Sequence, residues 1–192
     1  MFIYNEKDFS GMSLEEIQTW VALYKESLIG SAVFTANNSF ISRLVRWVQK
    51  FRCNDNHFIP SHVGSIVEYN NNLWVVNMQP PKASMTSLTH YISSDFETKG
   101  EVFSIIIRNF PIDKKMFCSN ILEHVGEFYP YLSAVRSVFT KRESKWRRHC
   151  SELHLRELQK QGYYMEVNSE ITPDELWHLL KDDLPSIKSR NN

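Results

Sequence analysis

A β-hairpin is predicted by residues 62–78, which read HVGSIVEYNNNLWVVNM. Two apolar runs, residues 62–69 and 73–78, are separated by three asparagines. Asparagine tolerates a positive φ, which the tight turns of hairpins require. The centre of the chain is therefore expected to form two paired antiparallel strands.

Further strands and helices are predicted on both sides of this hairpin. Residues 32–35 and 101–108 are apolar runs that indicate strands, the second of them buried. Helices are expected at residues 14–29, 40–50, 112–125, 129–140 and 150–161, and from residue 173 onward. Strands clustered between helices predict an α+β domain with one antiparallel sheet packed against helices.

Two capping boxes indicate where helices begin. Ser13 is followed three residues later by Glu16, and Thr172 by Glu175, with Pro173 at the first helical position of the second case. In such a box the two side chains satisfy each other's backbone N–H groups. The first helix is expected to close near Gly30.

Composition favours a folded domain without a strong overall charge. The 192 residues hold 22 basic and 22 acidic side chains, so no nucleic-acid partner is expected. No run reaches the roughly 18 apolar residues of a membrane span, and the first residues lack a secretory signal. A cytoplasmic location is the default expectation. The three cysteines suggest no disulfide framework, and neither a metal nor a cofactor is expected.

Cys150 stands where an irregular basic stretch becomes an apolar-periodic helix that ends near Gly162. At a helix start, the partial positive charge of the first-turn N–H groups lowers a thiol pKa and stabilises the thiolate. The same N–H groups can bind an oxyanion. Cys150 is therefore a candidate nucleophile, and the structural alternative is a small apolar residue between helix and core.

A thiol nucleophile requires a base, and His62 is the best placed of the seven histidines. It begins a strand directly after a loop, and Gly64 beyond it leaves room for close approach. His149 is adjacent to Cys150 but should point in another direction. His154 lies one helical turn on, and both are expected on the solvent side.

Two residues could orient the imidazole of His62. If Asn71 and Asn72 form the turn, Gln79 lies opposite Gly64, on the face of His62, while Asn77 lies opposite Ile66 and needs twist or a bulge to reach it. The sequence leaves both residues open.

Several segments, in this order, resemble one family. They are GSAVF (30–34), SFISRLVRW (39–47), SHVG (61–64), VNM (76–78), CSEL (150–153) and TPDELW (172–177). Together they resemble the circularly permuted NlpC-type papain-like cysteine hydrolases, the YiiX/YaeF-like group, in which the histidine strand precedes the cysteine helix. The resemblance covers residues 30–180.

The resemblance implies a permuted papain-like catalytic domain over residues 30–185. Residues 1–29 are then an N-terminal helical extension, and residues 186–192 a tail. It implies Cys150 as nucleophile, His62 as base and Asn77 as the third polar residue, where relatives often carry a carboxylate. Ser31, in place of a usual acidic residue, and the loop of residues 52–60 are further departures from the family.

The predicted activity is cleavage of an amide bond, in a peptide or a peptidoglycan stem peptide, through a thioester on Cys150. Acyl transfer or lipid-ester cleavage by the same fold, and an inactive binding module, are the alternatives. Residues 126–131 resemble the family's aromatic segment lining the pocket, which makes Tyr129 and Tyr131 candidate substrate-binding residues, with core packing as the alternative. Arg148 belongs to a basic stretch before Cys150 that could attract a substrate carboxylate or phosphate, or could be a solvated linker. Cys53 and Cys118 are expected to be bystanders.

Overall fold

The computed structural model describes residues 9, 11–36, 43, 46–47, 60–78, 81–98, 102–107, 111–128, 150–169 and 171–182. These residues form a five-stranded sheet in the order β4-β3-β2-β1-β5, in which every neighbouring pair is antiparallel. The strands are β1 (Ala32–Ala36), β2 (His62–Tyr69), β3 (Asn72–Asn77), β4 (Ser84–Ser87) and β5 (Val102–Ile106). The prediction of an α+β domain with one antiparallel sheet is confirmed.

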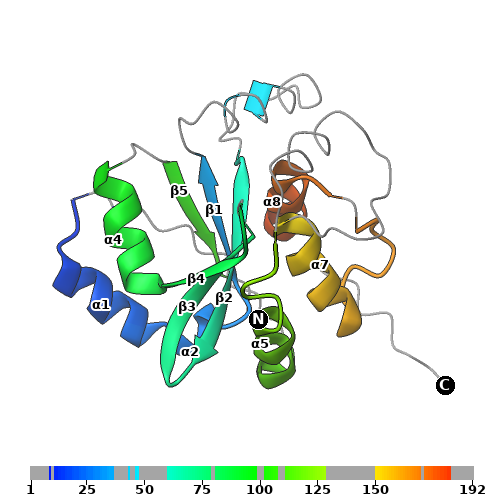
Figure 1. Ribbon diagram of the computed structural model, residues 1–192, viewed down its shortest axis with the longest axis horizontal. Coiled ribbons are helices and arrows are strands. Elements are labelled where there is room, and N and C mark those ends of the chain that lie inside the picture. Colours follow the sequence, from blue (N-terminus) through cyan, green and yellow to red (C-terminus); the bar gives the residue numbers. More distant parts are fainter. Residues whose placement is uncertain are drawn as a thin grey trace.

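Helices cover both sides of the sheet. In Figure 1, α1 and α4 lie on one side, and α5, α7 and α8 lie on the other. Contacts agree with this view, since α4 packs on β3 and β4, α5 and α7 pack on β2, and α8 packs on β5. The first six residues of β2 are all buried, as expected for a strand with both faces covered. The helices are α1 (Leu14–Leu23), α2 (Lys25–Leu28), α4 (Leu88–Thr98), α5 (Lys114–Leu122), α7 (Cys150–Lys160) and α8 (Pro173–Asp182).

Both predicted capping boxes are present. The Ser13 hydroxyl accepts from the Glu16 amide, and the Glu16 carboxylate accepts from the Ser13 amide at 2.7 Å. At α8, Glu175 accepts from the Thr172 amide at 2.8 Å, and Thr172 accepts in return at 3.2 Å. The first predicted helix is interrupted, because α1 ends at Leu23 before the short α2 begins.

The N-terminal helix α1 packs on α4. Its residues Ile17 and Trp20 belong to the hydrophobic core, and Phe9 meets the Trp20 ring edge-on at 4.9 Å between centroids. The division of the chain at residue 29 stays a prediction.

Helix α7 is buried on nearly every side, and not only along an apolar stripe. It packs against β2, α5 and α8 at once. Its polar residues Ser151, Glu152 and Glu157 are buried with its leucines, and His154 is completely buried. The prediction that His154 lies on the solvent side is wrong, because β2 and α5 cover the face that carries it.

Some predicted elements lie outside the described residues. These include the helix at 129–140, the tail at 186–192, and the helix at 40–50 apart from Arg43, Arg46 and Trp47, which are helical. Conversely, β4 and α4 were not predicted from the sequence. None of the helices in the described part of the chain is long and apolar enough to cross a bilayer.

Candidate functional site

Cys150 and His62 meet at the start of their two elements. Cys150 is the first residue of α7, and His62 is the first residue of β2, on which α7 packs. His62 is 8% exposed, and Cys150 is half-buried. The thiol forms hydrogen bonds with the imidazole of His62 and with the backbone of Val63 and Ser151. The two residues that the sequence singled out are therefore in contact.

The surroundings of Cys150 favour its thiolate. Burial raises the pKa of the Cys150 thiol, but the charge of His62 and the three hydrogen bonds outweigh burial and lower the pKa below its ordinary value. The Ser151 contribution comes from the first turn of α7, as expected for a cysteine at a helix start. Val63 lies one residue beyond the last β2–β3 pair, Gly64 with Asn77, so its amide is near the end of that ladder.

Asn77 is the residue that meets the far side of the imidazole. Its side-chain oxygen lies 3.1 Å from Nε2 of His62, and both residues are buried. An amide oxygen only accepts, so Nε2 carries the proton in this contact, and Nδ1 is left with a lone pair. A lone pair on Nδ1 is what a base needs in order to take a proton from a thiol.

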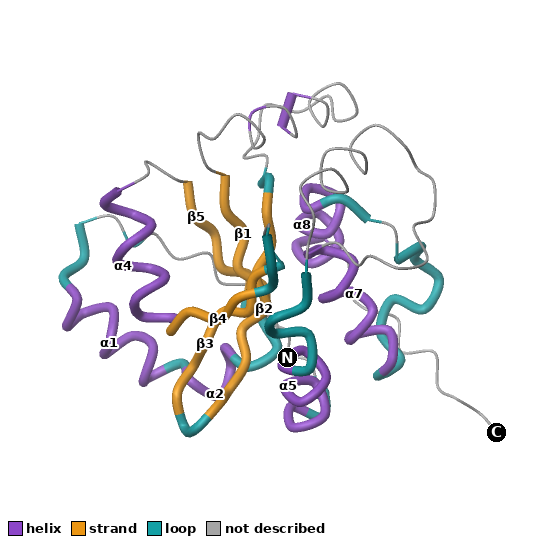
Figure 2. Tube along the Cα trace, in the orientation of Figure 1, coloured by secondary structure: helices purple, strands orange, loops and turns teal. Residues whose placement is uncertain are grey.

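The register of the hairpin differs from the prediction by two residues. The turn residues are Asn70 and Asn71, with φ of 50° and 62°, and not Asn71 and Asn72. Asn72 instead pairs with Tyr69 as part of β3. Figure 2 shows this turn beside α2.

The corrected register explains how Asn77 reaches His62. Asn77 lies opposite Gly64 rather than Ile66. Since side chains alternate between faces, Asn77 is a diagonal neighbour of His62 on one face, and neither twist nor a bulge is needed. Gln79, the other predicted orienter, lies outside the described residues.

Gly64 provides the space that the Asn77 side chain occupies. A Cβ at Gly64 would lie 2.8 Å from the Asn77 oxygen and 2.4 Å from Cγ1 of Val75. These distances are shorter than any van der Waals contact. A side chain at position 64 would therefore displace Val75 and Asn77, and Asn77 is the residue that contacts His62.

Alanine at position 64 is expected to disturb this contact. The added methyl group would push against Asn77 and Val75, and overpacking of this kind costs roughly 1–3 kcal/mol of unfolding free energy. Urea denaturation of Gly64→Ala measures the cost, and the same substitution in an Asn77→Ala background should cost less. Equal costs in both backgrounds would show that the glycine is not there for Asn77.

The other singled-out residues have different positions. Cys118 lies on α5, where its sulfur accepts from the Glu68 amide at 3.3 Å, and burial raises its pKa. Ser31 is buried, and its hydroxyl donates to the Ser27 carbonyl at 2.9 Å. The remaining predicted or weighed residues lie outside the described part of the chain: Cys53, Tyr129, Tyr131, Arg148 and His149.

Two features of the site region were missed from the sequence. The Val63 contact is made by backbone, which no side-chain pattern reveals. Ser65 on β2 and His154 on α7 form a buried pair with 2.9 Å between Oγ and Nδ1. The four-residue spacing of Cys150 and His154, which places both on one helical face, was the available signal for this pair.

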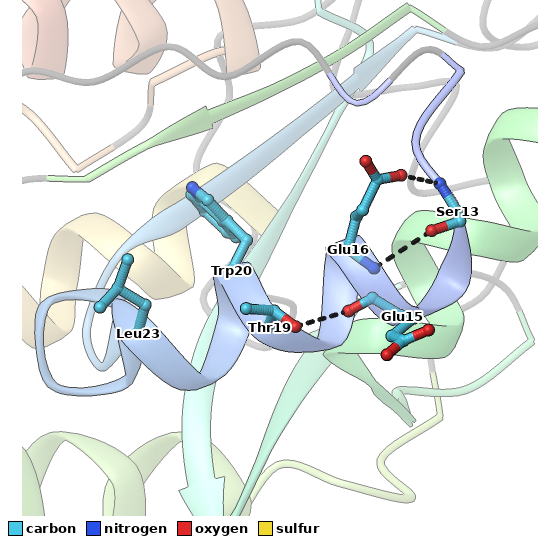
Figure 3. A pocket seen from close by; sticks show the side chains of 6 residues that line it. All are labelled: Ser13, Glu15, Glu16, Thr19, Trp20 and Leu23. Carbon is cyan, nitrogen blue, oxygen red and sulfur yellow. Dashed lines mark hydrogen bonds between the residues drawn. The ribbon is translucent and has the colours of Figure 1, made fainter.

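A shallow hollow on the surface lies elsewhere, along α1 (Figure 3). It is on the opposite side of the sheet from α7 (Figure 1). Its polar groups cap or brace the helix, through the Ser13–Glu16 box and the Thr19 hydroxyl that donates to the Glu15 carbonyl. Across the described ranges, His, Cys, Asp and Glu side chains form no group of three that could hold a metal ion.

Comparison with known proteins adds no family assignment. No protein-family model matches the chain, and searches of curated proteins and of solved structures find no match.

Proposed function

We propose that this protein is a cysteine hydrolase that cleaves an amide bond through a thioester on Cys150. The observation that carries the proposal is the chain of contacts from Cys150 through His62 to Asn77. Thiol-dependent acyl transfer needs a nucleophile in contact with a base, and a third group that orients the base; Cys150, His62 and Asn77 are arranged in this order. Cys118, buried with a raised pKa, has no such environment.

The proposed reaction has two halves. His62 takes the proton of Cys150, and the thiolate attacks the acyl carbon while N–H groups at the start of α7 stabilise the developing oxyanion. The amine leaves with the proton from His62, and a thioester remains. His62 then deprotonates a water molecule, which attacks the thioester and restores the thiol.

Asn77 has a supporting role in this mechanism. By accepting from Nε2–H, it fixes the tautomer in which Nδ1 carries the lone pair and can act as the base. An asparagine oxygen stabilises an imidazolium less than a carboxylate does, because it carries no full charge. We therefore expect a thiolate–imidazolium pair that depends more on the backbone contacts from Val63 and Ser151.

Peptides and peptidoglycan stem peptides are the proposed substrate class. This choice rests on the resemblance to NlpC-type hydrolases over residues 30–180. Acyl transfer and lipid-ester cleavage share the first half of the reaction and differ in the acyl group that reaches the cysteine.

The acyl group carried by Cys150 tests this proposal. The protein would be incubated with stem peptides or with phospholipid vesicles, quenched in acid, and the Cys150 peptide would be weighed by mass spectrometry. A peptidyl adduct on Cys150 is expected with stem peptides, and it should be absent from Cys150→Ser under the same quench. A fatty-acyl adduct would favour the lipid alternative. No adduct from either source would favour the binding module.

A further inference from the structure

Among the described residues, two directional side-chain contacts join helix α7 to strand β2, in addition to the packing between them. The first is Cys150, whose thiol contacts His62 and the Val63 backbone. The second is His154, whose Nδ1 lies 2.9 Å from the Ser65 hydroxyl. Cys150 and His154 are one helical turn apart, about 6 Å along α7. His62 and Ser65 are about 10 Å apart along β2.

Two attachment points constrain a helix more than one does. Apolar packing against β2, α5 and α8 holds α7 in place but is not directional, so with a directional contact at Cys150 alone, small pivots or slides of α7 on β2 would still change the separation of thiol and imidazole. The Ser65–His154 bond fixes a second position along both elements and so limits both motions. An error of about 1 Å in such a separation can lower a reaction rate about 100-fold.

The pair is buried, so no water replaces its hydrogen bond when it is broken. Ser65 is 3% exposed and His154 is fully buried. Among the described atoms, Nε2 of His154 has no hydrogen-bond partner, and Ser65 serves as the partner of the imidazole at Nδ1. Phe117 of α5 packs edge-on against the ring at 5.6 Å between centroids, which restricts its orientation further.

If position 154 served only to fill the core, a histidine would be less favourable there than an apolar side chain. A buried polar atom without a partner lowers stability, whereas a leucine of similar volume would not leave one. The neighbouring α7 residues Leu153 and Leu155 show that leucine is accommodated in this helix. What a histidine provides here, and a leucine would not, is a directional hydrogen bond to β2, the strand that carries His62.

We propose that Ser65 and His154 are positioning residues that set the separation between the Cys150 thiol and the His62 imidazole. This inference rests on the proposed function, because it gives the pair a role only if the thiol and imidazole act together. Neither residue contacts a reacting atom in this proposal. Both act through the placement of α7 on β2.

The test compares Ser65→Ala with Cys118→Ala. Each substitution removes one buried atom that joins β2 to a helix: the Ser65 hydroxyl bonds α7, and the Cys118 sulfur bonds the Glu68 amide from α5. The readout is the rate at which iodoacetamide alkylates Cys150 at pH 6, followed by mass spectrometry. This rate reports on thiolate formation and requires no substrate.

Ser65→Ala is expected to slow alkylation of Cys150 about tenfold, while Cys118→Ala changes it less than about twofold. Thermal melts would establish that both variants are folded. In a second series, His154→Asn, which keeps a polar group near the position of Nδ1, should retain more of the rate than His154→Leu. The positioning role is supported if both results are found, a slower rate in Ser65→Ala than in Cys118→Ala and a faster rate in His154→Asn than in His154→Leu.

Two other outcomes would overturn the inference, and they differ in whether the proposed function also fails. If Ser65→Ala and His154→Leu alkylate as fast as the native protein, the pair is structural only and the proposed function is unaffected. If native Cys150 itself reacts no faster than Cys118, the proposed function fails and the positioning role fails with it.

Discussion

Alanine in place of His62 is expected to slow the alkylation of Cys150 by iodoacetamide at pH 6 by roughly 10- to 100-fold. His62 supplies both a positive charge and a side-chain hydrogen bond to the thiol, and both lower the thiol pKa. Without them, burial dominates and the thiolate fraction at pH 6 falls. The remaining thiolate is more nucleophilic, which offsets part of the loss.

A second histidine gives a matched control for this prediction. His124 also pairs with another side chain, Glu127 at 2.9 Å, but it follows α5, and the groups that lower the Cys150 pKa are His62, Val63 and Ser151. His124→Ala should leave the alkylation rate of Cys150 unchanged. Equal rates in native protein, His62→Ala and His124→Ala would contradict the pairing of thiol and imidazole.

The second large effect concerns stability in acid. His154 is fully buried, and burial lowers its pKa from 6.5 to about 4. In the unfolded chain the same imidazole takes up a proton near pH 6.5, so between pH 6.5 and 4 unfolding binds a proton. The stability is therefore fully present above pH 6.5 and is lost as the pH falls towards 4. The loss from this residue is about 3 kcal/mol.

Urea denaturation at pH 7.5 and at pH 4 measures this loss. Other groups titrate in the same interval, so the useful quantity is the difference between native protein and His154→Asn, which cannot take up the proton. The variant is expected to be less stable at neutral pH but to lose about 3 kcal/mol less on acidification. Parallel losses in the two proteins would show that His154 takes up its proton as readily in the folded state as in the unfolded chain, and so would contradict the lowered pKa.

Elements with strong local signals were predictable from sequence. The strands β2 and β5 follow from apolar runs, and both capping boxes were recognisable because Ser13 and Thr172 each precede a glutamate by three residues. The end of α7 near Gly162, which has φ of 92°, was predictable for a similar reason. In each case a few adjacent residues determine the backbone.

Features that depend on distant packing were predicted poorly. The three asparagines at 70–72 all tolerate a positive φ, so local chemistry did not determine which two form the turn. Pairing across the sheet selected Asn70 and Asn71, and this choice brought Asn77 to His62. The burial of His154 likewise follows from the packing of α7 between β2, α5 and α8. The many polar residues of α7 gave no indication in the sequence that the helix is covered on several sides.

The candidate site was partly predictable because its chemistry is concentrated in a few side chains. A cysteine at a helix start and a histidine at a strand start were sufficient to choose Cys150 and His62. To choose between Asn77 and Gln79 as the residue that orients His62, the register of the β2–β3 pair had to be known. The backbone contact from Val63 could only be found in three dimensions.

The pH dependence of cysteine alkylation in the native protein is the sharpest test for a thiolate at Cys150. Iodoacetamide would be applied from pH 5 to 9, and the labelling of Cys150 and Cys118 followed separately by mass spectrometry. Because its pKa is lowered, Cys150 should react rapidly at pH 6 and level off early, whereas Cys118, whose pKa is raised, should react slowly and still accelerate at pH 9. Two slow and parallel profiles would contradict a thiolate at Cys150 supported by His62.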